Sequence, residues 1–389
     1  MNELENRALL PAGLRDILPP EAGYEAGIRE TLVGGFVGHG YDRVKPPLVE
    51  FEDGLTSGAG AAVSADTFRL MDPVSQRMMG LRADMTTQVA RIAATRLGDA
   101  PRPLRLSYTG EVLRIRGSQL RPERQFAQVG AELIGTKSAA ADIEIIEIAV
   151  ESLRKIGVPN LSVDLNIPPL VPALMDGMGL LSADYQTLRE ALDRKDVSAV
   201  RERGLDHAEE LCRLMEGTGA AEQALDVLST LSLPSAPAGE LEHLKAVVEG
   251  IRERIPNLDI TIDPVENRGF EYHTGVGFTF FVRGERGEVG AGGRYVTPPN
   301  GNNISDDGEP ATGFTLFIDT ILRVVPAAKP SPRIFVPRGS DADSVADLRG
   351  DGWVTIAALD HFDDPDAEAR RQGCDHILKA GNLVPLDED

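Results

Sequence analysis

The chain has 389 residues, of which 42% are hydrophobic and 26% charged, a composition typical of globular proteins with two or three domains. Its 40 Lys and Arg against 61 Asp and Glu give a net charge of −21, which opposes the approach of nucleic acid. Two distant cysteines and six scattered histidines offer no metal-ligand spacing, and neither a secretory signal nor a long apolar run is seen. We therefore expect a cytoplasmic protein without a metal, a cofactor or a membrane span.

The first part of the chain, to about residue 167, mixes helical and strand-like patterns. Two prolines introduce a predicted helix over 17–40, and the adjacent prolines in 41–50 require an extended backbone there. The periodicity of apolar residues predicts a further helix over 142–155. Strands are predicted over 68–81, 104–116, 124–134 and 161–166.

The composition changes at about residue 168. Residues 168–256 are rich in Leu, Ala, Glu and Arg, which indicates a helical insertion with helices over 185–192, 197–202, 207–215 and 240–254. Strand patterns return over 258–282, and the apolar run 311–325 predicts a buried helix. A Pro-rich linker then leads to a small α/β unit. We expect two domains, 1–326 and 327–389.

Two glycine-rich stretches, 58–62 and 290–293, invite comparison with phosphate-binding loops. Neither is followed by the Gly-Lys-Ser/Thr sequence of such loops, and neither opens a strand–turn–helix unit. We therefore interpret both as flexible turns.

Polar side chains stand inside strand-like stretches. Gln128 and Glu132 are four residues apart, so a strand places both on one face. Buried there, they must be paired or must face a polar ligand. A structural ion-pair network is one hypothesis. The other is an amino-acid ligand, whose ammonium suits Asp84 and Glu132 and whose carboxylate suits Arg268.

Six segments, in order, carry a resemblance to a known family. They are LLPAGLRDILPPEA, YDRVKPPLVE, GLRADMTTQVAR, GEVLRIRGSQLRPERQFAQVGAELIG, NRGFEYHTG, and GAGGRY followed by PATGFTLFIDTIL. Together they resemble the class II aminoacyl-tRNA synthetases, and histidyl-tRNA synthetase above all, over about residues 8–326. The resemblance implies an α+β fold: a six- or seven-stranded antiparallel sheet flanked by helices, with the helical insertion and a small, truncated C-terminal α/β unit.

The same resemblance implies a histidine-binding pocket and an anion contact at Arg114. Its expected histidine-binding residues are Asp84, Thr86, Gln128, Glu132, Arg268, Tyr272 and His273. Here Asp84 stands for a family Glu, and His273 for a family Tyr.

The nucleotide machinery departs from the family pattern. Arg116 stands where motif 2 has a Glu, and Thr320 where motif 3 has an Arg that holds phosphate. Losing such contacts to developing charge costs about 10²–10³ in rate each, so we expect no adenylation and no catalytic residue. The short, acidic C-terminal unit and the net charge also argue against tRNA binding.

A synthetase-like chain with a histidine pocket and a degenerate nucleotide site resembles the regulatory subunits of ATP phosphoribosyltransferase. That resemblance implies a partner, the short-form catalytic subunit of that enzyme. It also implies histidine as effector and a homodimer within a hetero-oligomer. Two other hypotheses stay open on the sequence: a divergent active synthetase, and a synthetase paralogue with another role.

Overall fold

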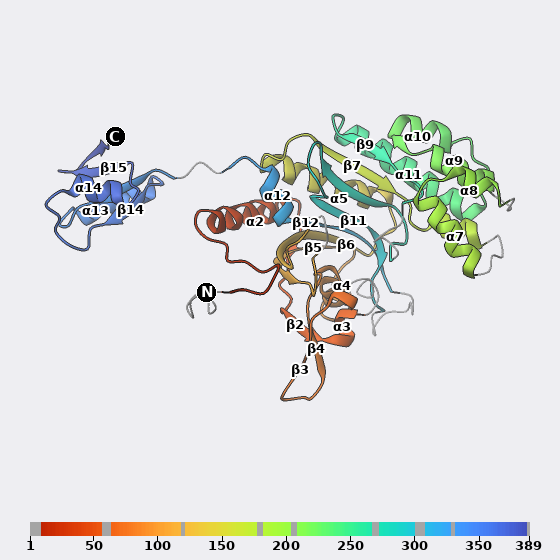
Figure 1. Cartoon of the computed structure of the whole chain (residues 1–389), viewed down its shortest axis with the longest axis horizontal. Helices are drawn as coiled ribbons and strands as arrows, with labels where there is room; N and C mark the ends of the chain where they lie inside the picture. The colour runs from red at the N-terminus through yellow and green to blue at the C-terminus, as the bar shows by residue number, and fades with distance from the viewer. Residues whose placement is uncertain are drawn as a thin grey trace. The chain divides into compact units, whose positions relative to one another are not determined.

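The computed structural model describes residues 9–56, 64–117, 121–176, 182–203, 208–266, 272–299, 308–327 and 331–386. The chain divides into two units, Met1–Pro326 and Ala327–Asp389, each with its own packed interior (Figure 1).

A nine-stranded sheet forms the centre of the first unit. Its six middle strands are β5, β6, β12, β11, β10 and β7 in spatial order, and they pair antiparallel. Strand β1 pairs with β5, and strand β9 pairs with β7, both in parallel. The predicted antiparallel sheet is thus present, but edge strands widen it beyond seven. In spatial order the strands are β1 (Asp42–Arg43), β5 (Leu104–Leu113), β6 (Gln125–Ile134), β12 (Pro310–Phe317), β11 (Gly290–Val296), β10 (Gly277–Val282), β7 (Leu161–Asn166), β9 (Asp259–Ile262) and β8 (Gly219–Ala220).

The two faces of this sheet have different neighbours. The helices α2 (Glu21–Gly38), α5 (Ala139–Lys155) and α12 (Ile318–Val324) share one apolar core with the first face. The short helix α4 (Thr86–Thr95) packs on the second face with a smaller core. Along β6, Val129 and Ala131 join the first core, whereas Gln128 and Glu132 point to the second face. The even spacing of those two polar residues therefore places them where a strand should.

Helix α5 ends at the predicted residue, Lys155, but begins at Ala139, three residues before the predicted start. The Ser138 hydroxyl accepts a hydrogen bond from the backbone N–H of Ala140 at the N-terminus, and Arg154 and Lys155 occupy the last turn. Its apolar residues pack on the sheet beside α2, and Phe314 of β12 lies between Phe36 and Phe280 in edge-to-face contacts.

The helical insertion holds more helices than its sequence predicted. It contains α6 (Leu170–Asp176), α7 (Ser182–Asp193), α8 (Val197–Arg201), α9 (Ala208–Glu216), α10 (Ala221–Leu228) and α11 (Ser235–Arg254). Of these, α6 and α10 were not predicted. Figure 1 shows α7 to α10 gathered at one end of the first unit, with α11 running back toward α5.

Two sequence predictions for the large sheet were wrong. Residues 311–325 form the end of a strand followed by the short helix α12, because a central strand buried on both faces is as continuously apolar as a buried helix. The glycines at 290–293 lie in β11 rather than in a turn. A Cβ atom at Gly292 would lie 2.1 Å from the carbonyl oxygen of Gly313, so close packing requires glycine there. The other glycine-rich stretch, 58–62, lies outside the described residues.

A small second sheet carries a projecting hairpin. It consists of β2 (Val49–Phe51), β4 (Met78–Leu81) and β3 (Arg69–Met71), with α3 (Glu52–Thr56) beside it. The predicted strand 68–81 is therefore two strands joined by a turn, in which the Asp72 carboxylate accepts hydrogen bonds from Val74 and Ser75. Figure 1 shows this hairpin extending away from the large sheet.

The second unit has a four-stranded sheet in the order β14-β13-β15-β16. Its elements are β13 (Arg333–Val336), α13 (Ala342–Gly350), β14 (Val354–Ala357), α14 (Pro365–Arg371), β15 (His376–Lys379) and β16 (Asn382–Pro385). In the described part of the whole chain, no helix has the length and apolar character needed to cross a membrane.

Replacing Phe314 by alanine tests the core of the first unit. We expect Phe314→Ala to lower the free energy of unfolding of that unit by about 3–5 kcal/mol, because it removes two ring contacts and leaves a cavity. Urea unfolding followed by circular dichroism measures the loss.

The single tryptophan, Trp353, reports the second unit, whose fluorescence transition should stay in place. Leu18→Ala, at a 66% exposed position outside the hairpin, is the control and should change stability by less than about 0.5 kcal/mol. An unchanged circular-dichroism transition would contradict the assigned core.

Candidate functional site

A cavity of about 710 Å³ opens on the second face of the large sheet, over β6, β12 and β11. Its described lining is strongly charged and acidic in balance. Six carboxyl side chains and two guanidinium groups contribute to it: Asp66, Asp84, Glu132, Asp164, Glu266, Glu288, Arg114 and Arg121.

Glu132 lies at the centre of this lining and is only 1% exposed. The hydroxyl groups of Tyr108 and Tyr295 donate hydrogen bonds to its two oxygens, at 3.2 and 2.9 Å. Burial raises the pKa of the Glu132 carboxyl to about 8. Glycine is needed opposite it, since a Cβ atom at Gly313 would lie 1.8 Å from a carboxylate oxygen. The carboxyl group is therefore held neutral at pH 7 in a fixed place.

Asp84 precedes α4 and is held on both oxygens. One accepts the backbone N–H of Thr86 at 2.8 Å, and the other accepts the side-chain amide of Gln128 at 2.9 Å. The Gln128 oxygen accepts the backbone N–H of Met85 at 3.1 Å. Gln128 is fully buried and is not in the described cavity lining, so its predicted contact with histidine stays a prediction. Its geometry is that of a residue that positions Asp84.

Thr86, Tyr272 and His273 line the same cavity. The Thr86 hydroxyl lies 3.3 Å from the hydroxyl of Tyr108, and the rings of Tyr272 and His273 stack with centroids 4.2 Å apart. Burial lowers the pKa of His273 to about 3, so its imidazole is neutral. Arg268, the arginine predicted to hold a ligand carboxylate, lies outside the described residues.

Two arginines form the other end of the cavity. Arg114 donates to the carbonyl of Ala83 at 3.3 Å and lies over the ring of Phe126, and burial lowers the pKa of its guanidinium. Arg121 lies 3.9 Å above the ring of Phe317 and pairs with Asp319 at 3.0 Å and Glu288 at 3.2 Å.

Sequence reasoning missed Arg121. It is one of several arginines in the stretch 114–124, and nothing in the sequence separates an inward guanidinium from an exposed one. Its two carboxylate partners are Glu288, just before β11, and Asp319 of α12, which lie far along the chain.

The two residues that depart from the synthetase pattern lie away from the acidic centre of the cavity. The Arg116 side chain is 74% exposed and pairs with Asp66 at 3.2 Å. Thr320 is 1% exposed on α12, where its hydroxyl accepts a hydrogen bond from Arg323 at 3.4 Å. Neither belongs to the described lining of the large cavity.

The arrangement favours a small polar ligand that carries positive charge. Asp84 and Glu132 are preorganised acceptors, and Arg114 and the carboxylate-paired Arg121 also line the cavity. Within the described ranges, no group of three or more His, Cys, Asp or Glu side chains is arranged to hold a metal ion.

The raised pKa of Glu132 makes stability depend on pH. Below about pH 4.5 both folded and unfolded chains hold this proton, and between about 4.5 and 8 only the folded chain keeps it. The stabilising contribution of the proton is thus lost as pH rises toward 8. We expect the free energy of unfolding of Glu132→Gln to fall less than that of the wild type across this range. Urea titrations at several pH values measure the difference, and parallel pH profiles would contradict the burial of an ionisable group.

The family model described as Histidyl-tRNA synthetase matches residues 13–321. The chain is 52% identical to the ATP phosphoribosyltransferase regulatory subunit of Paramagnetospirillum magneticum, over the full length of both chains. It is 50% identical to the protein of that name from Rhodospirillum centenum, over 98% of this chain and 97% of the relative. The more distant one from Alkalilimnicola ehrlichii is 36% identical, over 96% and 95% of the two chains.

Solved structures share the fold. An ATP phosphoribosyltransferase regulatory subunit/histidyl-tRNA synthetase from Bacillus halodurans has a TM-score of 0.79 at 24% identity, covering 93% of this chain and 96% of that one. A histidyl-tRNA synthetase from a Nostoc species has a TM-score of 0.76 at 18% identity, covering 96% and 91%. The full-length identities to the regulatory subunits decide the membership. The chain belongs to the family of ATP phosphoribosyltransferase regulatory subunits, a histidyl-tRNA synthetase-like family of histidine biosynthesis.

Proposed function

We propose that this chain binds histidine in its acidic cavity and a short-form ATP phosphoribosyltransferase catalytic subunit on its surface. The bound chain is required for activity of the catalytic subunit and relays inhibition by histidine to it. The observation that carries the histidine site is the pair of hydrogen-bonded acceptors, half-buried Asp84 and buried Glu132, in a cavity that tyrosines and glycines also line. Membership of the regulatory-subunit family supports the partner.

Histidine suits two parts of the cavity lining, the carboxyl groups and the aromatic rings. Its ammonium group is a hydrogen-bond donor that Asp84 and Glu132 can accept, and its imidazole can lie against the stacked rings of Tyr272 and His273. A cation placed beside Glu132 favours the ionised carboxylate, so binding at pH 7 displaces the proton that burial retains there.

The site supports binding without adenylation. Arg116 is exposed and Thr320 is buried in α12, so neither presents the group that the synthetase pattern requires. Arg121 also stacks on Phe317 and is neutralised by Asp319 and Glu288. The positive charge of this guanidinium is balanced by carboxylates of the same chain, so it is not left over for a ligand phosphate. The net charge of −21 likewise supports the absence of tRNA binding.

The role of the chain is then allosteric. Histidine changes how the chain holds the catalytic subunit, with a coupling free energy of about 1–3 kcal/mol that must act in both directions. Reconstitution with a short-form catalytic subunit tests this: product formation should need this chain and should fall when histidine is added. A catalytic subunit that is equally active and equally inhibited alone would refute the proposal.

Histidine binding itself is measured by calorimetry on the purified chain. We expect binding with release of a proton at pH 7, and no histidine-dependent ATP–pyrophosphate exchange. In Glu132→Gln the affinity should fall about tenfold or more and proton release should disappear, since a hydrogen bond to a charged group contributes about 1.5–3 kcal/mol. Glu151→Gln, on an exposed part of α5, is the control. Measurable exchange would show that the chain is an activating enzyme.

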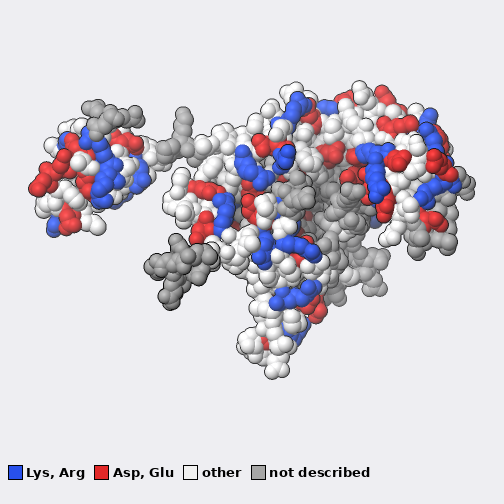
Figure 2. All heavy atoms as spheres, in the orientation of Figure 1, with Lys and Arg blue, Asp and Glu red and all other residues white. Residues whose placement is uncertain are grey.

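The projecting hairpin supports self-association of the chain as a homodimer within the larger complex. Around it, six large apolar side chains are exposed: Leu48, Phe51, Leu70, Met71, Val74 and Met78. Figure 2 shows the end of this hairpin with few charged atoms, unlike the mixed charges over the rest of that face. Apolar side chains gathered in this way mark an interface.

Charging this surface should separate the dimer. Sedimentation equilibrium of Met71→Glu/Val74→Glu should give the mass of one chain, where the wild type gives twice that mass, because two buried carboxylates per subunit would have to lose their water. Leu359→Glu adds charge at an 86% exposed apolar position of the second unit and should leave the mass unchanged. A double variant that keeps the wild-type mass places the dimer contact elsewhere.

A further inference from the structure

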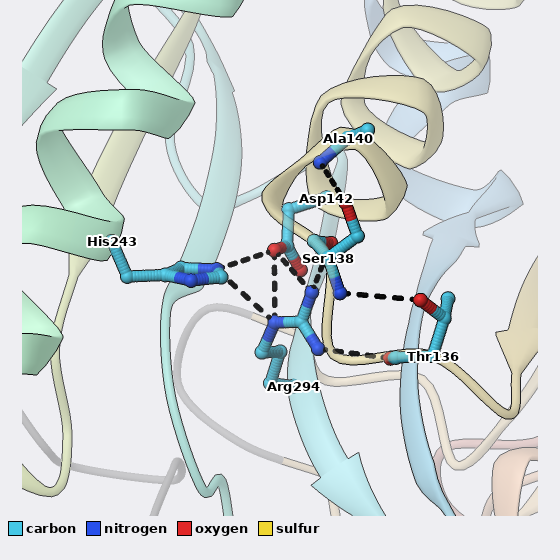
Figure 3. Close-up of polar contacts among 6 residues, drawn as sticks. All are labelled: Thr136, Ser138, Ala140, Asp142, His243 and Arg294. Atoms are coloured by element: carbon cyan, nitrogen blue, oxygen red, sulfur yellow. Dashed lines mark hydrogen bonds and ion pairs between the residues drawn. The ribbon is translucent and has the colours of Figure 1, made fainter.

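A buried charged cluster lies behind the cavity wall, on the opposite face of β11 (Figure 3). Nε and Nη2 of Arg294 lie 2.8 and 2.7 Å from one carboxylate oxygen of Asp142, and the imidazole Nε2 of His243 lies 2.8 Å from the same oxygen. The remaining Arg294 donors reach the carbonyl oxygens of Thr136 and Ser138, at 3.2 and 2.5 Å. Arg294 is 7% exposed and Asp142 is fully buried.

Three elements meet in this cluster. Asp142 belongs to the first turn of α5, Arg294 to β11, and His243 to α11, the last helix of the helical insertion. Removing one partner from a buried ion pair leaves an uncompensated charge, which is strongly unfavourable. Arg294 therefore has to follow the position of Asp142 and of the helix that carries His243.

Tyr295, which follows Arg294 in β11, points into the cavity. Neighbouring side chains of a strand lie on opposite faces, so Arg294 is anchored behind the sheet while Tyr295 donates to Glu132 in front of it at 2.9 Å. The backbone of Arg294 also bonds to the segment that carries His273, through Thr274 and Val276 at 2.9 Å each. A displacement of Arg294 thus moves two parts of the cavity wall together.

Helix α11 packs unusually closely on α5. A Cβ atom at Gly250 would lie 2.1 Å from Cδ1 of Ile143, so a methyl group there requires the Ile143 side chain or the helix to shift. Gly239, on the same helix, has no atom within 4 Å of such a Cβ. The chain thus offers one position on α11 where a methyl group strains the contact with α5, and one where it does not.

We propose that the cluster of Asp142, Arg294 and His243 couples the helical insertion to the cavity, so that the seating of α11 on α5 sets the affinity of the cavity for its ligand. His243 acts as a positioning residue, through Arg294 and β11, and does not touch the ligand. The choice of histidine as probe rests on the proposed function. A partner that binds the insertion and shifts α11 would change histidine affinity through this cluster.

The test compares three substitutions in the full-length chain. His243→Ala should weaken histidine binding about 2- to 30-fold, the range by which residues remote from a ligand modulate a site. His243→Gln, whose amide can donate to Asp142 in place of Nε2, should restore the affinity. His39→Ala is the matched control, because it removes another His–carboxylate contact to α5, to Glu151 at 3.0 Å, at a place away from β11. A purely structural role would lower the unfolding midpoint of His243→Ala and leave its histidine affinity unchanged, which would overturn the proposal.

Hydrogen exchange of the chain without ligand gives a second readout. His243→Ala and Gly250→Ala should both speed exchange in the β11 peptide, and Gly239→Ala and His39→Ala should not. If the wild-type chain binds no histidine, the proposed ligand is wrong, while faster β11 exchange in both variants would still establish the coupling. Unchanged β11 exchange in both variants would overturn the coupling whether or not histidine binds.

Discussion

The carboxyl group of Glu132 lies in the middle of a nine-stranded sheet, and a buried carboxyl is tolerated only where hydrogen bonds replace its water. Several features of the cavity follow from this constraint. Tyr108 from the neighbouring strand β5 and Tyr295 from β11, on the far side of β12, donate to it, and glycine is required at position 313 because the carboxylate fills the space of a side chain. The same burial keeps the group protonated at pH 7, which leaves it ready to ionise when a cation enters.

The sheet serves two purposes because its faces are different. One face packs on α2 and α5 and supplies most of the core, while the other is free to present polar groups over β6, β12 and β11. Strand β11 carries both roles in adjacent residues, with Arg294 tied to α5 and α11 and Tyr295 tied to Glu132. This strand therefore joins the insertion to the cavity through a few hydrogen bonds and little intervening structure.

Under the proposed function, this synthetase fold would bind histidine without activating it. Arg114 is retained and buried, but Thr320 is held within α12 and Arg116 faces solvent beside Asp66. Arg121 turns inward, where Asp319 and Glu288 neutralise it. Asp84 and Glu132, in contrast, are held in place by hydrogen bonds on both of their oxygens.

The sequence by itself determined the family, the fold class and several helices and strands of this protein. Ordered motifs identified the family and the fold, period-two spacing placed Gln128 and Glu132 on one face of β6, and amphipathic periodicity located α5 and most helices of the insertion. Local patterns failed where burial is complete. The run 311–325 is apolar because β12 is covered on both faces, and the glycines at 290–293 lie in a strand because opposing backbone leaves no room for side chains. Only the tertiary structure decided that Gln128 holds Asp84, that Arg121 turns inward, and that His243 meets Arg294, because each of these contacts joins residues at least 44 positions apart. Spacing along the chain carries no signal for contacts of that kind, since they depend on how separately formed elements pack together.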